Sequence, residues 1–108
     1  MPLLPADDLE PSRDYIVEST VWRHKGTAAW HFANLSVEQS ADIKSRYGTT
    51  ASGWGSIRVR IRIGKTEWNT SLFPDKKSGT YLFAIKADVR KAEKLSDGGS
   101  ITANIRVV

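Results

Sequence analysis

Three arginines alternate with aliphatic residues along one stretch of the sequence. Arg58, Arg60 and Arg62 are each separated by a single aliphatic residue. This period of two predicts a strand over residues 56–63 with its arginines on one face, because successive side chains of a strand point to opposite faces. Guanidinium groups bind phosphate through paired N–H donors, so the row is a candidate surface for an anionic ligand or nucleic acid. The alternative is a solvated outer face whose charges oppose edge-to-edge aggregation.

The two residues after this strand predict a tight hairpin. Gly64-Lys65 places glycine where a two-residue turn needs a positive φ angle, so Ile63 is expected to pair with Thr66. That register puts aliphatic residues on one face and polar residues on the other, whereas a slip of one residue would mix them. The polar pairs are then Arg62 with Glu67, Arg60 with Asn69 and Arg58 with Ser71, which adds Asn69 and Ser71 to the candidate anion-binding residues.

Two further segments are candidates for contact with an anion. An expected loop after the hairpin carries Asp75 and Lys76, and loops on a rigid scaffold often hold binding residues. The alternative is a turn shaped by its proline and glycine, with the charges in solvent. Lys86, Arg90 and Lys94 are spaced i, i+4, i+8 and would share one face of a helix, either to contact phosphate or as its solvated side.

The four tryptophans indicate where the core lies. Trp30 and Trp68 fall on faces that we assign to the core, because large aromatic side chains dominate core burial. Trp54 lies between two glycines, and it either stacks on the ring of a ligand or base or fills one end of the core. We retain Trp54 as a candidate binding residue.

The residue types needed for catalysis or metal binding are scarce. The chain has no cysteine, and His24 and His31 match no common zinc-ligand spacing. No serine can be placed beside a histidine, no glycine-rich nucleotide-binding motif occurs, and the carboxylates form no recognisable acid–base pair. We therefore expect no enzyme activity, no metal and no cofactor.

The remaining pattern is mostly β structure with two short helices. Residues 15–23 and 28–34 are rich in β-branched and aromatic residues and predict a first hairpin. Ser36-Val37-Glu38-Gln39 is a capping box that opens a helix ending near Tyr47, before Gly48. The other expected elements are a loop at 73–79, a strand at 80–85, a helix at 87–95 and a strand at 100–107.

The element order strand–strand–helix–strand occurs twice. Gly55-Ser56-Ile57-x-x-x-Ile61-Arg62 recurs 44 residues later from Gly99 to Arg106, and Trp30-x-Phe32-Ala33 recurs 51 residues later as Tyr81-x-Phe83-Ala84. The common order of the two matches indicates a duplication, with units at about 15–63 and 66–107. Each unit alone has open strand edges and little core, so we expect the two to close on each other around a pseudo-two-fold axis.

The stretch from Trp68 to Lys76, together with Gly79, Tyr81 and the run from Ile85 to Glu93, resembles a bacterial family of domains of unknown function. The resemblance covers residues 15–108, and members of that family are sometimes fused to YdeI/OmpD-associated, bacteriocin-protection-like segments. It implies a double-split β-barrel capped by helices, a fold shared with the AbrB and MazE transcription factors and antitoxins. The segment 85–101 resembles the helix–strand unit of those proteins, although Gly98-Gly99 stands where they usually have Gly-Asp.

Composition fits one domain with an unusual start. The chain has 108 residues, of which 40% are hydrophobic and 26% charged. Of the net charge of +4, residues 1–14 carry −3 and the remaining 94 carry +7, so we expect a flexible acidic leader at 1–14 and one β-barrel domain at 15–108. No apolar run reaches the roughly 20 residues of a membrane helix. The start lacks a signal-peptide pattern, and we expect a cytoplasmic protein.

The basic domain and its polar candidates predict a non-catalytic binding or regulatory module that acts as a monomer. Its expected partner is an anionic ligand or a protein. The alternative is DNA binding, by analogy of fold with AbrB and MazE. Those proteins read paired sites as two-fold dimers, whereas a duplicated chain closes on itself, and this difference argues against the alternative.

Overall fold

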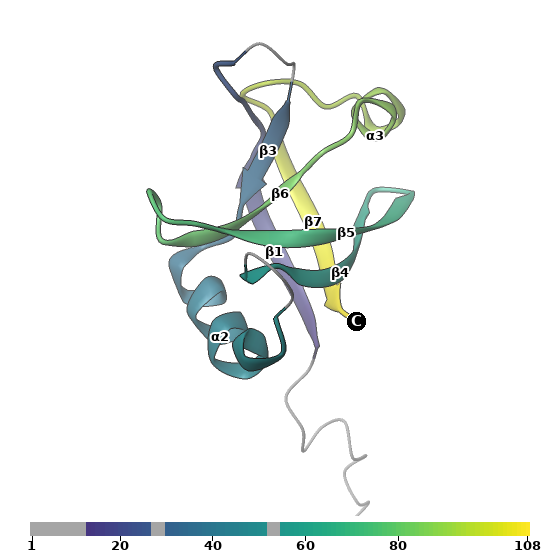
Figure 1. Cartoon of the computed structure of the whole chain (residues 1–108). Coiled ribbons are helices and arrows are strands. Elements are labelled where there is room, and N and C mark those ends of the chain that lie inside the picture. The colour runs from purple at the N-terminus through teal and green to yellow at the C-terminus, as the bar shows by residue number, and fades with distance from the viewer. Residues whose placement is uncertain (1–12, 27–29, 52–54) are drawn as a thin grey trace, which may run out of the picture.

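The computed structural model describes residues 13–26, 30–51 and 55–108. Within them, seven strands form one antiparallel sheet that curls strongly into half a barrel, and two short helices complete the fold (Figure 1). The strand order across the sheet is β1-β7-β4-β5-β6-β3-β2. The strands are β1 (Asp14–Thr20), β2 (Trp22–Arg23), β3 (His31–Asn34), β4 (Ile57–Ile63), β5 (Thr66–Asp75), β6 (Thr80–Ala84) and β7 (Ser100–Val107). Residues 1–12 of the expected leader lie outside the described residues, so the leader stays a prediction. Its last residue, Asp14, is the first residue of β1.

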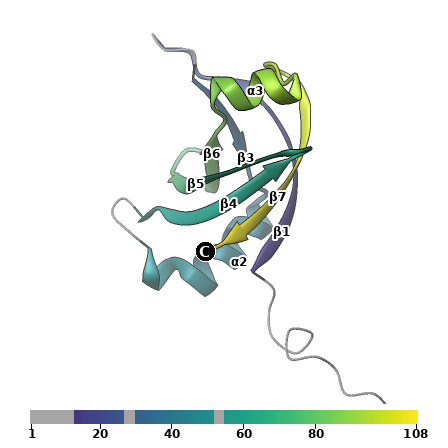
Figure 2. The same ribbon diagram turned by 90° about the vertical axis from the view of Figure 1, so that its right-hand side faces the viewer.

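The two helices lie at opposite ends of the curled sheet. Helix α2 (Val37–Tyr47) is followed by a 3-10 turn, η1 (Gly48–Thr50), and helix α3 (Ala87–Glu93) lies at the other end (Figures 1 and 2). The core fills the inside of the curl, where every second residue of β4 and of β7 is buried. Burying one such aliphatic side chain contributes about 1.5–3 kcal/mol, so this alternation is a main source of stability.

The predicted β4–β5 hairpin is confirmed residue by residue. Ile63 pairs with Thr66, Ile61 with Trp68 and Ile57 with Leu72, and the polar pairs follow the predicted register as well. Gly64 has a φ angle of 59°, as the two-residue turn requires. The arginines therefore share the outer face of the sheet.

The capping box of α2 is also confirmed. The Ser36 hydroxyl accepts from the backbone N–H of Gln39 at 3.0 Å, and the Gln39 side chain accepts from the Ser36 N–H at 3.5 Å. The Gln39 amide nitrogen also donates to the carbonyl oxygen of Ile16 at 2.7 Å, which ties the start of α2 to β1. The helix ends at Tyr47 as predicted.

The predicted first hairpin is wrong over most of its length. Strand β1 pairs with β7, and only the two residues of β2 pair with β3. Val21 separates β1 from β2, with its N–H donating to the carbonyl of Gly99 and its carbonyl accepting from the N–H of Gly98, both at 2.8 Å. The chain thus changes partner at this buried residue, which strand propensity alone does not reveal.

The assignment of Trp30 to the core is also wrong. Trp30 is 56% exposed, whereas Ala33 and its cross-strand partner Phe83 are fully buried. Opposite residues of an antiparallel pair lie on the same face, and Phe83 fills the core at this level with only a small alanine facing it. Trp30 and Phe32 therefore lie on the outer face, while Trp68 is partly buried against the core as expected.

One of the two repeat matches is out of register. Tyr81 and Phe83 point into the core, but Trp30 and Phe32, which match them in sequence, do not. A shift of 50 residues in place of 51 aligns His31 with Tyr81 and Ala33 with Phe83, so that inward residues correspond. The second helix is shorter than the predicted 87–95, because Lys94 takes a left-handed conformation with φ 54°.

Candidate functional site

The arginine face consists of Arg58, Arg60 and Arg62 on β4 and Arg106 on β7. The first three are exposed on alternate positions of β4, as predicted. Arg106 is the direct cross-strand neighbour of Arg60, and sequence reasoning missed it because the β4–β7 pairing was not predicted. Four guanidinium groups therefore share one outer surface of the sheet.

Most of this charge is already partnered. Arg60 contacts Glu67 at 3.5 Å, and Arg106 contacts Asp14 at 3.4 Å. Arg58 donates to the hydroxyl of Ser71 at 3.2 Å. Asn69 is exposed opposite Arg60. The face is therefore a surface of mixed charge, which favours a solvated outer face over a concentrated anion site.

Lys86, Arg90 and Lys94 do not form the predicted row on one helix. Helix α3 begins at Ala87, so Lys86 is its N-cap residue, and Lys94 follows the helix in a left-handed conformation. Arg90 is the only one of the three within the seven helical residues, and its Nε donates to the carbonyl of Ile85 at 3.2 Å.

The predicted loop at 73–79 is strand in its first three residues and turn in its last four. Strand β5 continues to Asp75, and only the residues from Lys76 to Gly79 form the turn to β6. Asp75 builds this turn, since its carboxylate accepts from the Ser78 hydroxyl at 2.8 Å and from the Lys77 N–H at 3.3 Å. The Ser78 hydroxyl and the Lys77 N–H thereby hold the pKa of Asp75 below its usual value. Asp75 is therefore structural, while Lys76 is exposed at the end of β5.

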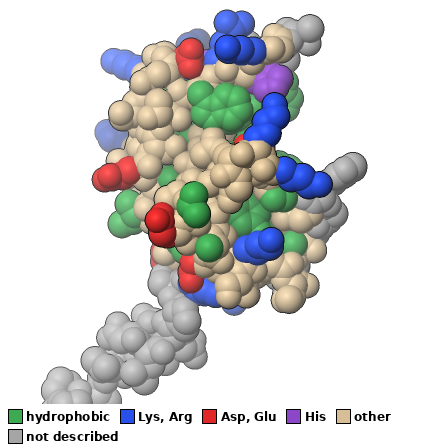
Figure 3. All heavy atoms as spheres, turned by 90° about the vertical axis from the view of Figure 1, so that its left-hand side faces the viewer, with side chains coloured by type: hydrophobic (Ala, Val, Ile, Leu, Met, Phe, Trp, Pro, Cys, Tyr) green, Lys and Arg blue, Asp and Glu red, His purple; other side chains and the backbone are tan. Residues whose placement is uncertain are grey.

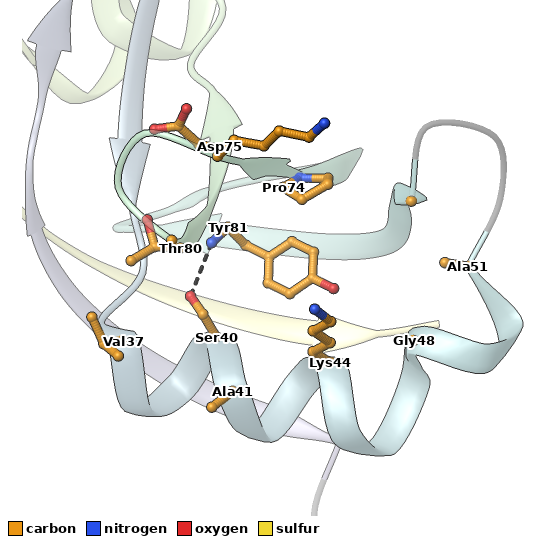
Figure 4. A pocket seen from close by; sticks show the side chains of 13 residues that line it. Val37, Ser40, Ala41, Lys44, Gly48, Ala51, Pro74, Asp75, Thr80 and Tyr81 are labelled. Atoms are coloured by element: carbon orange, nitrogen blue, oxygen red, sulfur yellow. Dashed lines mark hydrogen bonds between the residues drawn. The ribbon is translucent and has the colours of Figure 1, made fainter.

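A hollow of about 470 Å³ lies between α2 and the β5–β6 hairpin, and we call it the α2 hollow. Figure 3 shows hydrophobic side chains between Lys or Arg side chains on the side of the molecule where these elements meet. Among the described residues, its walls include Val37 and Ala41 from α2, Pro74 from β5 and Tyr81 from β6, with Lys44 and Lys76 at the rim (Figure 4).

Hydrogen bonds fix the backbone of Tyr81 against α2. Its N–H donates to the buried hydroxyl of Ser40 at 2.9 Å, and its carbonyl accepts from the N–H of Leu35 at 2.9 Å. Both backbone groups therefore point away from β5, and the paired residue there, Pro74, needs no N–H. This explains how a proline can continue β5 and form one wall of the hollow.

The side chain of Tyr81 lies inside the α2 hollow. It is 6% exposed, its ring points along the hollow, and the Lys44 side chain extends toward it from α2 (Figure 4). Its hydroxyl has no hydrogen-bond partner among residues 13–26, 30–51 and 55–108, and it is open to the hollow, because the fully buried unpaired side-chain polar atom in these ranges is Trp68 Nε1. Burial raises the pKa of Tyr81, so the group stays a neutral donor near pH 7.

The structure thus brings together two predicted site residues, Asp75 and Lys76, with residues that sequence reasoning passed over. Ser40 carried the clearest signal, because it shares a helical face with Ile43 and Tyr47 and a polar residue there must find a buried partner. Nothing in the sequence alone pointed to Lys44. Trp54, another predicted site residue, lies outside the described residues.

The described part of the chain holds neither a cluster of metal-ligating side chains nor a membrane-spanning helix. Residues 13–26, 30–51 and 55–108 contain no cluster of three or more histidine, aspartate or glutamate side chains suited to a metal ion. No helix in these ranges is long and apolar enough to cross a membrane.

Comparison with known proteins gives a family. The model of a family described as a domain of unknown function, DUF1905, matches residues 18–105. The match runs from Glu18 in β1 to Ile105 in β7 and includes both helices and the α2 hollow. No curated protein matches the chain. The resemblance to a family of domains of unknown function is therefore confirmed.

Proposed function

We propose that this chain, which belongs to the DUF1905 family, is a non-catalytic binding module that holds a small organic anion in the α2 hollow. The observation that carries the proposal is the Tyr81 hydroxyl, which is open to the α2 hollow and has no partner among the described residues. A bound acceptor would give it a hydrogen bond, and such a bond contributes about 0.5–1.5 kcal/mol.

The chemistry of the hollow defines the ligand class. Lys44 and Lys76 supply two positive charges at the rim, and the Tyr81 hydroxyl supplies a neutral donor deeper inside. Val37, Ala41 and Pro74 supply apolar walls. A carboxylate or phosphate group on an apolar body satisfies all three features, and the volume lies in the usual range for small-molecule sites.

The same residues support binding without catalysis. The Ser40 hydroxyl is occupied by the N–H of Tyr81, and the Asp75 carboxylate is occupied by its own turn. Neither is available as a nucleophile or base beside the hollow. The alternative function, DNA binding, gains less support, because three arginines of the arginine face already contact Asp14, Glu67 or Ser71.

The test is a titration of the ¹⁵N-labelled chain with three probes: benzoate, benzyl alcohol and inorganic phosphate. We expect benzoate to shift the backbone amide signals of Ser40, Lys44 and Tyr81. Benzyl alcohol has the same ring without charge and should bind more weakly, and phosphate lacks the apolar body and should do the same. Lys44→Gln should weaken benzoate binding about 1.5- to 5-fold, as expected for an exposed charge.

Lys65→Gln is the matched control, because Lys65 lies in the exposed β4–β5 turn and does not line the hollow. It removes the same charge from the chain, and benzoate affinity should stay unchanged. Equal weakening by Lys65→Gln and Lys44→Gln would show that only net charge matters. Amide shifts confined to residues outside the α2 hollow would overturn the proposed site.

We further propose that the half-barrel is a double-split β-barrel built from two units related by a pseudo-two-fold axis. Two backbone hydrogen bonds support this proposal. The Leu35 N–H donates to the Tyr81 carbonyl, and the Ile85 N–H donates to the His31 carbonyl. Leu35 corresponds to Ile85 and His31 to Tyr81 at a shift of 50 residues, so a two-fold axis exchanges the two bonds. The same shift relates the helix caps Ser36 and Lys86. The strand pairing has the same symmetry. β1 and β5 begin the two units and β4 and β7 end them, so the pairing of β1 with β7 corresponds to the pairing of β5 with β4.

A further inference from the structure

A second hollow, of about 430 Å³, lies beneath α3, and we call it the α3 hollow. The shift of 50 residues that relates the two helix caps also relates its residues to those of the α2 hollow. Ala87 takes the place of Val37, Arg90 that of Ser40 and His31 that of Tyr81. The two hollows thus occupy corresponding positions but carry different chemistry.

An aromatic strip forms one wall of the α3 hollow and continues beyond it. Trp30 lines the hollow and stacks on Phe32, with ring centroids 6.0 Å apart and an interplanar angle of 13°. The ring of Phe32 in turn packs against that of Trp22, with ring centroids 5.0 Å apart. The Trp22 indole N–H donates to Asn34 at 2.6 Å, which fixes one end of the strip, whereas Trp30 at the other end is 56% exposed.

Two basic side chains lie at the exposed end of this strip. Lys86 and Arg90 line the α3 hollow beside Trp30, and the bond from Arg90 Nε to the Ile85 carbonyl orients its guanidinium. Arg23 is also exposed, but it pairs with His31 and therefore lies on the opposite face from Trp22 and Phe32. Asp97 is the acidic neighbour of this region, and its carboxylate accepts from the Arg23 backbone N–H. Figure 3 shows hydrophobic, Lys or Arg and His side chains gathered toward one end of the molecule.

We propose that the α3 hollow and the aromatic strip bind single-stranded nucleic acid. One base stacks on the exposed ring of Trp30, and the adjacent phosphates contact Lys86 and Arg90. Base stacking on aromatic side chains combined with a basic groove is the usual chemistry of such sites. The strip is longer than one base requires, since it spans three rings, one from β2, one from β3 and one from the residue before β3, and this favours a nucleic-acid strand over a free nucleotide. The proposal does not rest on anion binding in the α2 hollow.

The test is fluorescence anisotropy with a labelled ten-nucleotide oligothymidylate and the full chain. With two phosphate contacts, affinity should fall about sevenfold between 50 and 200 mM salt, from a slope of roughly 0.7 per contact. Trp30→Ala should weaken binding by at least about fivefold, and Trp30→Phe should restore most of it because it keeps a stacking face. Lys86→Gln should halve the salt slope. Lys91→Gln removes a charge from an exposed position of the same helix outside the hollow, and it should leave the slope unchanged.

Three results would overturn the proposal. The first is absence of binding at 50 mM salt. The second is equal affinity of the wild-type chain and the Trp30→Ala variant, which should fold normally because the ring is largely exposed. The third is displacement of the oligonucleotide by thymidine monophosphate at equal nucleotide concentration, or equally tight binding of the same sequence as duplex. The exposed Lys86→Gln variant keeps the test valid if Trp30→Ala folds poorly, since an unchanged salt slope there also contradicts the proposal.

Discussion

Some polar side chains around the α2 hollow have a partner within the fold, and the side chain of Tyr81 differs from them. The side-chain oxygen of Asn34 accepts from the Trp22 indole N–H at 2.6 Å, and its side-chain nitrogen donates to the Thr80 hydroxyl at 3.0 Å. The Ser40 hydroxyl and the Asp75 carboxylate are each held by a neighbouring segment. The hydroxyl of Tyr81 and the ammonium groups of Lys44 and Lys76 have no partner among the described residues, and an anionic ligand would supply one.

Gly64 is a second residue with a specific requirement, and it gives a stability prediction. Its φ angle is 59°, and an added Cβ atom would lie 2.0 Å from a carboxylate oxygen of Glu93 on α3. That carboxylate also accepts from the Thr66 hydroxyl at 2.6 Å, so it cannot move without losing a hydrogen bond. Gly64→Ala should therefore lower the free energy of unfolding by more than the roughly 1–3 kcal/mol of the left-handed conformation alone. Urea unfolding measures this loss.

Gly79→Ala is the matched control, because Gly79 has a φ angle of 71° with no atom within 4 Å of an added Cβ. It isolates the conformational cost from the contact with Glu93. If Gly64→Ala and Gly79→Ala lose the same stability, the docking of Glu93 over the β4–β5 turn contributes nothing.

At the scale of elements, α2 is tied to the sheet by an ionic network. The Asp42 carboxylate accepts from the Tyr15 hydroxyl of β1 and contacts Arg46 one turn further along α2 at 3.2 Å. The Arg46 guanidinium also lies 5.0 Å from the centre of the Tyr47 ring. Hydrogen bonds from Tyr15 and Arg46 lower the pKa of Asp42, so its ionised form is favoured in the folded state.

This network predicts how stability depends on pH. Because the folded pKa lies below the unfolded value, the contribution of Asp42 is present above about pH 4 and is lost as the pH falls through the folded pKa. Asp42→Asn should be less stable than the wild-type chain at pH 6, and the difference should shrink at pH 2–3. Urea unfolding at each pH measures it. A difference that stays constant with pH would show that Asp42 does not titrate with folding.

The elements also show what a sequence can and cannot predict. Residues 57–72 were predictable because alternation, the turn glycine and the cross-strand pairs all demand one register. The extension of β5 through Pro74 was not, since it depends on the Tyr81 backbone bonding to Ser40 and Leu35 in place of β5. The outward position of Trp30 follows from Phe83 filling the core, a contact between distant segments.

At the scale of the whole molecule, the curled sheet brings its first and last strands together. β1 and β2 stand at the two ends of the strand order, yet only Val21 separates them in the chain. The two ends of the sheet are thus joined within one chain, which favours completion of the sheet without a second copy. We predict a monomer, with a mass near 12.0 kDa in sedimentation equilibrium. A species of twice that mass at micromolar concentration would contradict this prediction.

The candidate site was less predictable than the fold, for a reason that also lies at this scale. Lys44, Pro74 and Tyr81 come from three elements, and their proximity depends on how α2 closes one end of the sheet. The predicted candidates were instead chosen along single strands or helices, where spacing is visible. Arg58 and Arg60 accordingly lie where predicted, but on a surface whose charges are partnered.

The most direct test of anion binding in the α2 hollow is thermal unfolding of the wild-type chain and the Tyr81→Phe variant, each with and without benzoate. We predict that Tyr81→Phe alone is about as stable as the wild type, because the hydroxyl that it removes makes no hydrogen bond within the described residues. We also predict that benzoate raises the melting temperature of the wild type more than that of the variant, since binding to the folded state stabilises it by mass action. A variant that is destabilised without ligand, or an equal benzoate effect on both proteins, would contradict the account.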